Sequence, residues 1–254
     1  MKLLWKGLIY TMEKLSNDFE QRFLNLEENL KVIREHIAEA AMKSGRKPQE
    51  ITLLAATKTV PVEVINHGIS LGIDHIGENK VQELCEKYDS YQLDTCELQF
   101  IGHLQTNKVK NIIGKVKMIQ SVDSTKLAGE ISRLSVSHAL TTDLLIEVNI
   151  GSEPNKSGVL PQNLNELLLE AAVLPSICIR GLMAIPPADA NSSETIVFFS
   201  NMYQYFVDIK TKRIDNVNMD YLSMGMSSDY VQAILAGANM VRVGSALFGP
   251  RIYK

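Results

Sequence analysis

The hydrophobic pattern of the N-terminal region predicts one long amphipathic helix over Asp18–Ser44. Apolar residues recur there at spacings that alternate between four and three, which places them on one face of a helix. They are Phe19, Phe23, Leu26, Leu30, Ile33, Ile37 and Ala40. Ser16 and Asn17 are candidate caps at its start, and Gly45 and Pro48 follow its end. We expect this helix to pack against a barrel, because about three heptads are marginal for the alternative, a coiled coil.

After this helix, β-branched apolar runs alternate with helix-like patterns. Eight runs predict strands: Ile51–Thr57, Asp74–Gly77, Leu98–Ile101, Met118–Val122, Leu144–Ile150, Ile177–Ala184, Met219–Ser223 and Met240–Val243. The helix-like patterns include Pro61–Leu71, Asn79–Tyr88, Ser124–Val136, Pro161–Val173, Glu194–Lys210 and Asp229–Ala236. Eight strand-then-helix units predict a (β/α)₈ barrel, and a doubly wound sheet is the alternative if the strands do not close.

The chain predicts one domain. No linker rich in Gly, Ser or Pro interrupts it, so we assign residues 12–254 to a single barrel domain. Residues 1–11 form an N-terminal extension, disordered or partly helical, and Met12 is an alternative start. Lys6 interrupts the apolar stretch of this extension, which therefore resembles a signal peptide only weakly. The sequence contains no run of 18 apolar residues, so we expect no membrane span.

Composition narrows the class of protein. Apolar residues make up 45% of the 254 residues and charged residues 22%, which is typical of a globular chain and not of a disordered one. The net charge of −3 provides no overall basic field for nucleic acid or an anionic membrane, although a local patch stays open. Three scattered cysteines, Cys85, Cys96 and Cys178, indicate neither a disulfide framework nor a zinc site and suit a reducing cytosol.

In a parallel barrel the chemistry lies at the carboxyl ends of the strands, and Lys58 follows the first of them. Six apolar or small residues, Thr52 to Thr57, precede it, so we expect partial desolvation to lower the pKa of its ammonium group. A neutral amine is what Schiff-base chemistry with an aldehyde requires. The alternative is a rim lysine whose ammonium group reaches bulk water.

The loops after the seventh and eighth strands predict a phosphate site. Gly225 lets the backbone approach a ligand, and Ser227, Ser228 or Asp229 caps the next helix, whose N-terminus attracts anions. The eighth strand adds two further small residues, Gly244 and Ser245. Barrels frequently bind phosphate between these two loops, although Ser and Gly are also routine caps without any ligand.

Arg242 is the third candidate group for ligand binding, after Lys58 and the phosphate loops. It lies between Val241 and Val243 on a strand, so its side chain points away from theirs. A guanidinium inside the barrel requires a partner, which is either a ring nitrogen of a ligand or a carboxylate such as Glu147. Asn79 follows the second strand and either orients a ligand hydroxyl or caps the helix that begins at Lys80.

Other candidate functional residues and motifs give weaker indications of a site. His103 has no second histidine or carboxylate at ligand spacing, so we predict no metal site. Asn155, Lys156, Ser157 and Gly158 form either an active-site lid or an ordinary solvated loop. The region Ser223–Asp229 contains Met-Gly-Met and no dinucleotide fingerprint, and the usual P-loop, zincin and hydrolase motifs are absent.

An amine that traps aldehydes, a phosphate cradle and a partner for a ring nitrogen together describe a site for pyridoxal 5′-phosphate (PLP). The sequence closely resembles the YggS/PROSC family of PLP homeostasis proteins from about Leu15 to Phe248. Gln99 stands where relatives more often have His, a difference from which we expect no consequence. The resemblance depends on these motifs: Ala56-Thr57-Lys58, Ile76-Gly77-Glu78-Asn79, Phe100–Lys108, Arg180-Gly181-Leu182-Met183, Leu222–Asp229 and Val241-Arg242-Val243-Gly244.

The resemblance implies a TIM barrel of the alanine-racemase N-terminal (PLP fold type III) kind with an extra N-terminal helix. It implies that Lys58 forms an internal aldimine with PLP and that Arg242 faces the pyridine nitrogen. Ser227, Gly244 and Ser245 would hold the phosphate. Asn79 would lie near the ring hydroxyl, and Ser223 and Met224 would line the pocket.

The family lacks an established catalytic activity, so the resemblance implies a cytoplasmic regulator that buffers or delivers PLP. Its expected partners are PLP and PLP-requiring apo-enzymes, and we expect a monomer. Physics supports this reading, because an arginine disfavours a protonated pyridine and so weakens the electron sink. Racemases of this type also carry a second domain that supplies a catalytic tyrosine, and we expect none here because few residues follow Arg242 in this sequence. The alternatives are a narrow PLP enzyme, such as a racemase or decarboxylase, and a barrel that binds another sugar or nucleotide phosphate.

Overall fold

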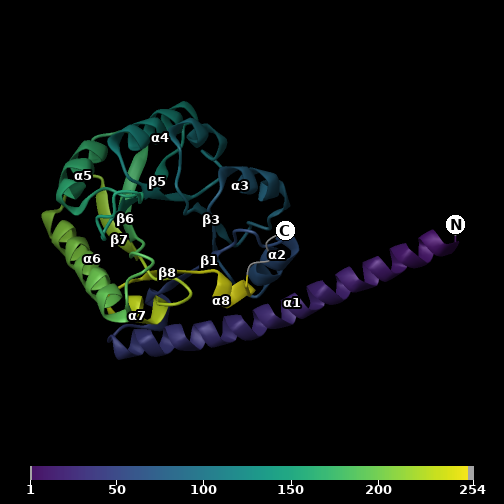
Figure 1. The fold of residues 1–254 in the computed structure, drawn as a ribbon. Helices are drawn as coiled ribbons and strands as arrows, with labels where there is room; N and C mark the ends of the chain where they lie inside the picture. The colour runs from purple at the N-terminus through teal and green to yellow at the C-terminus, as the bar shows by residue number, and fades with distance from the viewer. Residues whose placement is uncertain (1, 251–254) are drawn as a thin grey trace.

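The computed structural model describes the backbone of residues 2–250 and the side chains of residues 19–250. Its central feature is a closed barrel of eight parallel strands in sequence order (Figure 1). β1 pairs with β8 as well as with β2, which closes the barrel and confirms the predicted fold. The strands are β1 (Thr52–Ala56), β2 (His75–Glu78), β3 (Glu97–Phe100), β4 (Met118–Val122), β5 (Thr142–Val148), β6 (Ile177–Ala184), β7 (Val217–Ser223) and β8 (Met240–Val243).

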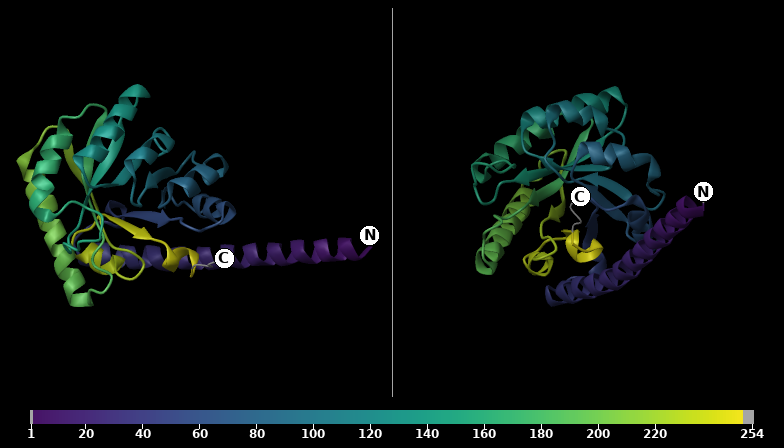
Figure 2. Two further views of the ribbon diagram at one scale, coloured as in Figure 1. Left: turned by 45° about the horizontal axis from the view of Figure 1, so that its top comes forward. Right: turned by 45° about the vertical axis from the view of Figure 1, so that its right-hand side comes forward.

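Helices follow most of the strands and cover the outside of the barrel (Figures 1 and 2). All six predicted helix patterns are confirmed to within a few residues at each end. β3 and β4 are joined only by a 3-10 helix, η3 (Thr106–Asn111). The α-helices after β1 are α2 (Val62–Ser70), α3 (Val81–Lys87), α4 (Thr125–Ser137), α5 (Leu164–Ala172), α6 (Ser192–Lys212), α7 (Tyr230–Leu235) and α8 (Ser245–Phe248). Three further 3-10 helices are η1 (Pro48–Glu50), η2 (Tyr88–Ser90) and η4 (Pro161–Asn163).

The N-terminal helix α1 (Lys2–Lys43) is longer than the pattern predicted. Ser16 and Asn17, expected as caps, lie inside it, because no proline interrupts the chain and each added residue extends an existing helix by one hydrogen bond. Residues 2–11 of the expected extension are therefore helical, and Met1 lies outside the described residues. The predicted apolar face is buried from Leu26 to Ala40, where α1 lies along α7 and α8. The first part of α1 extends beyond the barrel (Figures 1 and 2).

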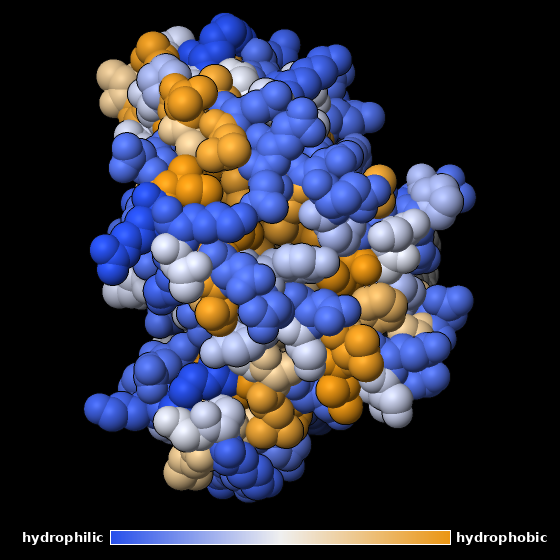
Figure 3. Space-filling model, turned by 90° about the vertical axis from the view of Figure 1, so that its left-hand side faces the viewer, coloured by the Kyte–Doolittle hydropathy of each residue, from blue (hydrophilic) through white to orange (hydrophobic). Residues whose placement is uncertain are grey.

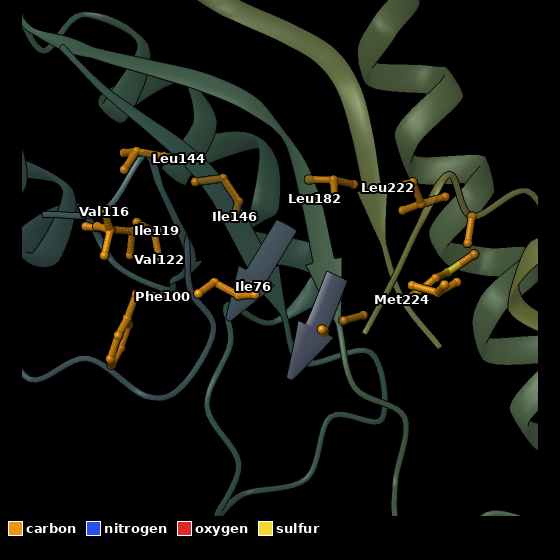
Figure 4. Close-up of a cluster of buried hydrophobic side chains, with 14 of the residues drawn as sticks. Ile76, Phe100, Val116, Ile119, Val122, Leu144, Ile146, Leu182, Leu222 and Met224 are labelled. Carbon is orange, nitrogen blue, oxygen red and sulfur yellow. The ribbon is translucent and has the colours of Figure 1, made fainter. Parts of the chain in front are cut away.

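Two layers of apolar side chains stabilise the barrel. The larger core lies between the strands and the covering helices, and Figure 4 shows part of it, including Phe100, Ile119 and Leu144. Two smaller clusters consist of residues on the strands or, for Ile101, directly after one: Leu54, Ala56, Ile101 and Met240, and Met118, Leu145 and Met183, with Tyr221 packed against both. A parallel strand is thus buried on both sides, which explains its nearly continuous apolar sequence.

The outer surface mixes polar and apolar residues. Figure 3 shows one face of the molecule, on which small apolar areas are separated by hydrophilic side chains. Exposed apolar residues of this protein include Leu169 on α5, Val173 directly after it, and Val197 and Tyr203 on α6. Within the described part of the chain, no helix is both long and apolar enough to cross a membrane.

Candidate functional site

The carboxyl ends of β1 and β8 bring the predicted lysine and two predicted phosphate-binding residues together. Lys58 lies half-buried in the turn after β1. It lines a small hollow together with Gly244 and Ser245, which follow β8 and begin α8. The strands are hydrogen-bonded neighbours, so residues almost 190 positions apart in sequence meet at one end of the barrel.

A buried carboxylate holds the turn that carries Lys58. Glu78, at the end of β2, is fully buried, and its Oε1 accepts hydrogen bonds from Thr57 Oγ1 at 2.8 Å, Lys87 Nζ at 3.0 Å and Tyr91 Oη at 2.8 Å. Burial and the charge of Glu78 raise the pKa of Tyr91, so its hydroxyl stays protonated and donates. The position before Lys58 is therefore fixed by a charge-assisted network.

A second carboxylate holds the position after Lys58. Glu83 Oε1 accepts hydrogen bonds from the backbone N–H of Thr59 at 2.6 Å and from Lys87 Nζ at 2.6 Å. Thr59 adopts φ of 62°, a left-handed conformation that is strained for a β-branched residue and requires such support. Lys87 Nζ also donates to the carbonyl of Thr57 at 3.2 Å. Sequence reasoning missed this cluster, although the i,i+4 spacing of Glu83 and Lys87 was visible.

Arg242 points into the barrel, opposite to its two strand neighbours as strand alternation predicted. Val241 and Val243 belong to the outer core, whereas the guanidinium of Arg242 donates from Nη1 to Ser223 Oγ at 2.7 Å and from Nη2 to the carbonyl of Ala184 at 3.0 Å. Only 4% of the residue is exposed. Burial lowers the pKa of Arg242 to about 10, partly offset by nearby carboxylates, so it stays protonated at neutral pH.

The expected alternative, an ion pair between Arg242 and Glu147, is not formed. No carboxylate among residues 19–250 lies within the 4.0 Å ion-pair distance of the guanidinium. Glu147 is buried, and this desolvation, with the negative charge of Asp123, raises its pKa to about 7, although Arg242 acts in the opposite direction. The cationic side chain of Arg242 is therefore held by neutral groups.

Ser227 joins the loops that follow β7 and β8. Its Oγ accepts hydrogen bonds from the backbone N–H groups of Gly244 at 3.1 Å and Ala246 at 3.2 Å, at the start of α8. Two of the predicted phosphate-binding residues are thus in direct contact, and backbone N–H groups converge on the Ser227 oxygen. An oxygen-rich anion would find the same donors there.

The helix after β7 begins at one of the three predicted cap residues, but without a capping bond from its side chain. Asp229 is the N-cap of α7, but its side chain makes no bond to that helix and instead accepts from the backbone N–H of Met226 at 2.6 Å. Gly225 has φ of 90°, and a Cβ there would overlap Ala233 of α7. The glycine is thus required by helix packing, whether or not a ligand approaches it.

Asn79 and Met224 lie outside the hollow beside Lys58. Asn79 lines a separate groove that includes Lys80 and His103, and its buried Oδ1 has no hydrogen-bond partner. It does not cap α3, whose N-cap is Lys80, so that alternative is wrong. The side chain of Met224 is fully buried in the outer core (Figure 4), and its backbone N–H donates to the carbonyl of Met240 at 3.1 Å.

His103 and the three cysteines are not among the residues that line the hollow beside Lys58. Within the described residues no three His, Cys, Asp or Glu side chains are placed to hold a metal ion. His103 Nδ1 lies 3.0 Å from Ser157 Oγ, a contact that brings the loop after β5 to the loop after β3. The thiols of all three cysteines are free.

Comparison with known proteins defines the class. The family model "Alanine racemase, N-terminal domain" matches residues 24–251. Alanine racemase of Clostridium difficile 630 has the same fold, with a TM-score of 0.68 at 18% identity, over 88% of this chain and 56% of that chain. The predicted alanine-racemase type of barrel is thereby confirmed.

Within that class, relatives of higher sequence identity define the family more closely. The chain is 42% identical over 230 residues to the pyridoxal phosphate homeostasis protein of Aquifex aeolicus (strain VF5), which covers 91% of this chain and all of the relative. It is 37% identical to that of Escherichia coli (strain K12), over 89% of this chain and 96% of the relative. The chain belongs to the pyridoxal phosphate homeostasis protein family, as the motifs indicated.

Two solved structures at 31% identity also share this fold. PipY of Synechococcus elongatus PCC7942, in a structure with PLP bound, superposes with a TM-score of 0.74 at 31% identity, over 84% of this chain and 100% of PipY. A protein of unknown function from Bifidobacterium adolescentis superposes with a TM-score of 0.85 at 31% identity, over 89% of this chain and 96% of that one.

Proposed function

We propose that this protein binds PLP at the carboxyl end of its barrel and takes part in PLP homeostasis. The observation that carries the proposal is the shared hollow of Lys58, Gly244 and Ser245, which places a primary amine beside a site with backbone N–H donors. Membership of the family and the PLP-bound structure of PipY support it.

The residues present fit the chemical groups of PLP. The phosphate would be held by Ser227, Gly244 and Ser245, where backbone N–H groups already converge on an oxygen atom. Arg242 can donate to a ring nitrogen and can accept nothing, so it suits a nitrogen with a free lone pair. When bound, PLP supplies an aldehyde that condenses reversibly with a primary amine, and Lys58 would provide that amine.

The remaining assignments depend on the family resemblance. Asn79 would lie near the ring hydroxyl, and its unpartnered buried Oδ1 is a group that such a contact would satisfy. Ser223 and Met224 would line the pocket. The hydroxyl of Ser223 is already bonded to Arg242, so Ser223 would act through that arginine as well as by contact.

We propose further that the protein is a regulator and not an enzyme, and that it supplies PLP to apo-enzymes in the cytosol. Arg242 stays cationic and has no carboxylate partner, so a second positive charge on the pyridine nitrogen is disfavoured. A neutral pyridine withdraws electrons weakly, which limits racemase or decarboxylase chemistry. The three free thiols suit a reducing compartment.

The test is absorption spectroscopy on purified protein with and without PLP, followed by borohydride reduction and peptide mass mapping. We expect a yellow absorption band and one PLP mass on Lys58. Lys58→Ala should lose the covalent link, whereas Lys110→Ala, an exposed lysine on η3, should behave like wild type. A protein that stays colourless and takes up no PLP would overturn the proposal. Incubation with an amino-acid panel separates the alternative, since turnover at about 1 per second or faster would indicate an enzyme.

A further inference from the structure

We infer that Gln120, with Gln99 behind it, is a positioning residue that fixes the guanidinium of Arg242 through the hydroxyl of Ser223. This inference rests on the proposed function in one respect only, that Arg242 faces bound PLP. The four side chains come from β3, β4, β7 and β8 and form one chain of hydrogen bonds. Arg242 Nη1 donates to Ser223 Oγ at 2.7 Å, and Ser223 Oγ donates to Gln120 Oε1 at 2.7 Å. Gln120 Nε2 in turn donates to Gln99 Oε1 at 2.6 Å.

The direction of every bond in this chain follows from the guanidinium. Arginine only donates, so Ser223 Oγ accepts from it and the serine hydroxyl hydrogen is left for another acceptor. Gln120 Oε1 is that acceptor, which turns its amide nitrogen toward Gln99 Oε1 and toward Met240 Sδ at 3.1 Å. A reversed Gln120 amide would leave the hydroxyl hydrogen of Ser223 without an acceptor.

Burial makes the chain sensitive to the loss of one member. Gln99, Gln120 and Ser223 are all fully buried, and the apolar side chains of Met118 and Met240 lie on two of the strands that carry the chain, β4 and β8. Water does not replace a missing partner in such surroundings, so each polar atom depends on its neighbour. The chain ends at Gln99 Nε2, a buried donor with no partner. That unpaired end argues against a role in stability alone, because an apolar pair would avoid its cost.

The consequence for Arg242 is a fixed orientation. Nη1 donates to Ser223 at the end of β7, and Nη2 donates to the carbonyl of Ala184 at the end of β6. Without Gln120, the Ser223 hydroxyl is free to rotate and to turn its hydrogen toward the arginine. Gln120 thus keeps the remaining N–H groups of Arg242 directed at the position proposed for the PLP ring. Gln99, from which the sequence predicted no consequence, orients Gln120.

The experiment compares Gln120→Leu and Ser223→Ala with Ser223→Thr, which keeps the hydroxyl, and with Ser121→Ala as the matched control. Ser121 is the neighbour of Gln120 on β4, is equally buried, and its hydroxyl has no hydrogen-bond partner. The first readout is the NMR signal of the Arg242 side-chain N–H groups in PLP-free protein, assigned by its loss in Arg242→Lys. The second is the dissociation constant and absorption maximum of added PLP.

We expect Gln120→Leu and Ser223→Ala to broaden the Arg242 signal and speed its hydrogen exchange with water. We also expect them to weaken PLP binding about tenfold and to shift the absorption maximum. Ser223→Thr should recover most of this loss, and Ser121→Ala should match wild type. An Arg242 signal that stays unchanged in Gln120→Leu would overturn the inference, and so would equal effects of Ser121→Ala. A wild-type protein that takes up no PLP would contradict the proposed function, while the Arg242 signal would still decide this inference.

Discussion

Lys87 Nζ lies 3.0 Å from Oε1 of Glu78, a carboxylate that is fully buried behind the turn carrying Lys58. The same ammonium group lies 2.6 Å from Glu83. One lysine therefore neutralises two carboxylates that between them bond both neighbours of Lys58. Removing one partner of such a buried pair is costly, because the other charge stays desolvated.

The first prediction concerns this cluster. Lys87→Met should lower the free energy of unfolding by about 3 kcal/mol, since Glu78 then keeps a buried charge without a cation. Tyr91→Phe should cost less, about 1 kcal/mol, because it removes one hydrogen bond to that carboxylate. Urea denaturation measures both. Gln82→Ala, which removes an exposed hydrogen bond to Glu86 on α3, is the control and should change stability by less than about 0.5 kcal/mol. A Lys87→Met protein as stable as this control would contradict the prediction.

The second prediction is a pH dependence caused by Glu147. Its pKa in the folded protein is raised to about 7, so the folded state holds a proton that the unfolded state releases at lower pH. Stability is therefore highest below the unfolded pKa and falls as pH rises through about 7, by at most about 3 kcal/mol. Glu147→Gln should remove this decline in denaturation curves measured from pH 5 to pH 8.

A second variant tests the cause of the raised pKa. The negative charge of Asp123 contributes to it, so Asp123→Asn should move the decline to lower pH without abolishing it. NMR titration of the Glu147 carboxyl carbon follows the same change directly. A carboxyl group that titrates near its ordinary value in the wild-type protein would refute both expectations.

The third prediction compares two glycines. A Cβ on Gly102, in the loop after β3, would overlap the backbone carbonyl of Asn79, so Gly102→Ala should cost about 3 kcal/mol and displace the loop after β2. Gly129 lies inside α4, where a Cβ would meet nothing within 4 Å. Gly129→Ala should therefore stabilise the protein by about 1 kcal/mol, because alanine favours the helix. Thermal and urea unfolding should show shifts of opposite sign, and a Gly102→Ala protein as stable as wild type would contradict the close approach.

The fourth prediction concerns Ser227. Ser227→Ala removes the acceptor of two backbone N–H groups at the start of α8, so it should lower the free energy of unfolding by about 1 kcal/mol. It should also weaken PLP binding, which a fluorescence titration measures. Ser228→Ala, which removes an exposed hydroxyl next to it, is the matched control and should leave both quantities near wild type. Equal behaviour of the two variants would exclude Ser227 from the phosphate site.

Much of the fold was predictable because the barrel strands are buried on both sides. Continuous apolar runs such as Met118–Val122 and Ile177–Ala184 could therefore be recognised as strands, and their observed bounds coincide with the predicted ones. The start of α1 was not predicted. Ser16 and Asn17 have the character of caps, but no residue before them stops the helix from extending toward the N-terminus. Local sequence identifies candidate caps, and the neighbouring turns decide which are used.

The site was predictable in part, for a similar reason. Strand alternation alone placed the side chain of Arg242 opposite to Val241 and Val243, and the closed barrel turned that direction inward. Its partner could not be predicted. Glu147 was as reasonable as Ser223, because the choice depends on distances across the barrel that strand tilt and register set.

The sequence by itself determined the (β/α)₈ order, the family and the position of Lys58 after the first strand. Those features depend on periodicity and motifs, which are local properties of the chain. Tertiary structure alone decided that Glu78 and Glu83 bond both neighbours of Lys58, that Arg242 is held by Ser223 and not by Glu147, and that two glutamines lie behind that serine. These contacts join residues from different strands, and closure of the barrel brings such residues within hydrogen-bonding distance.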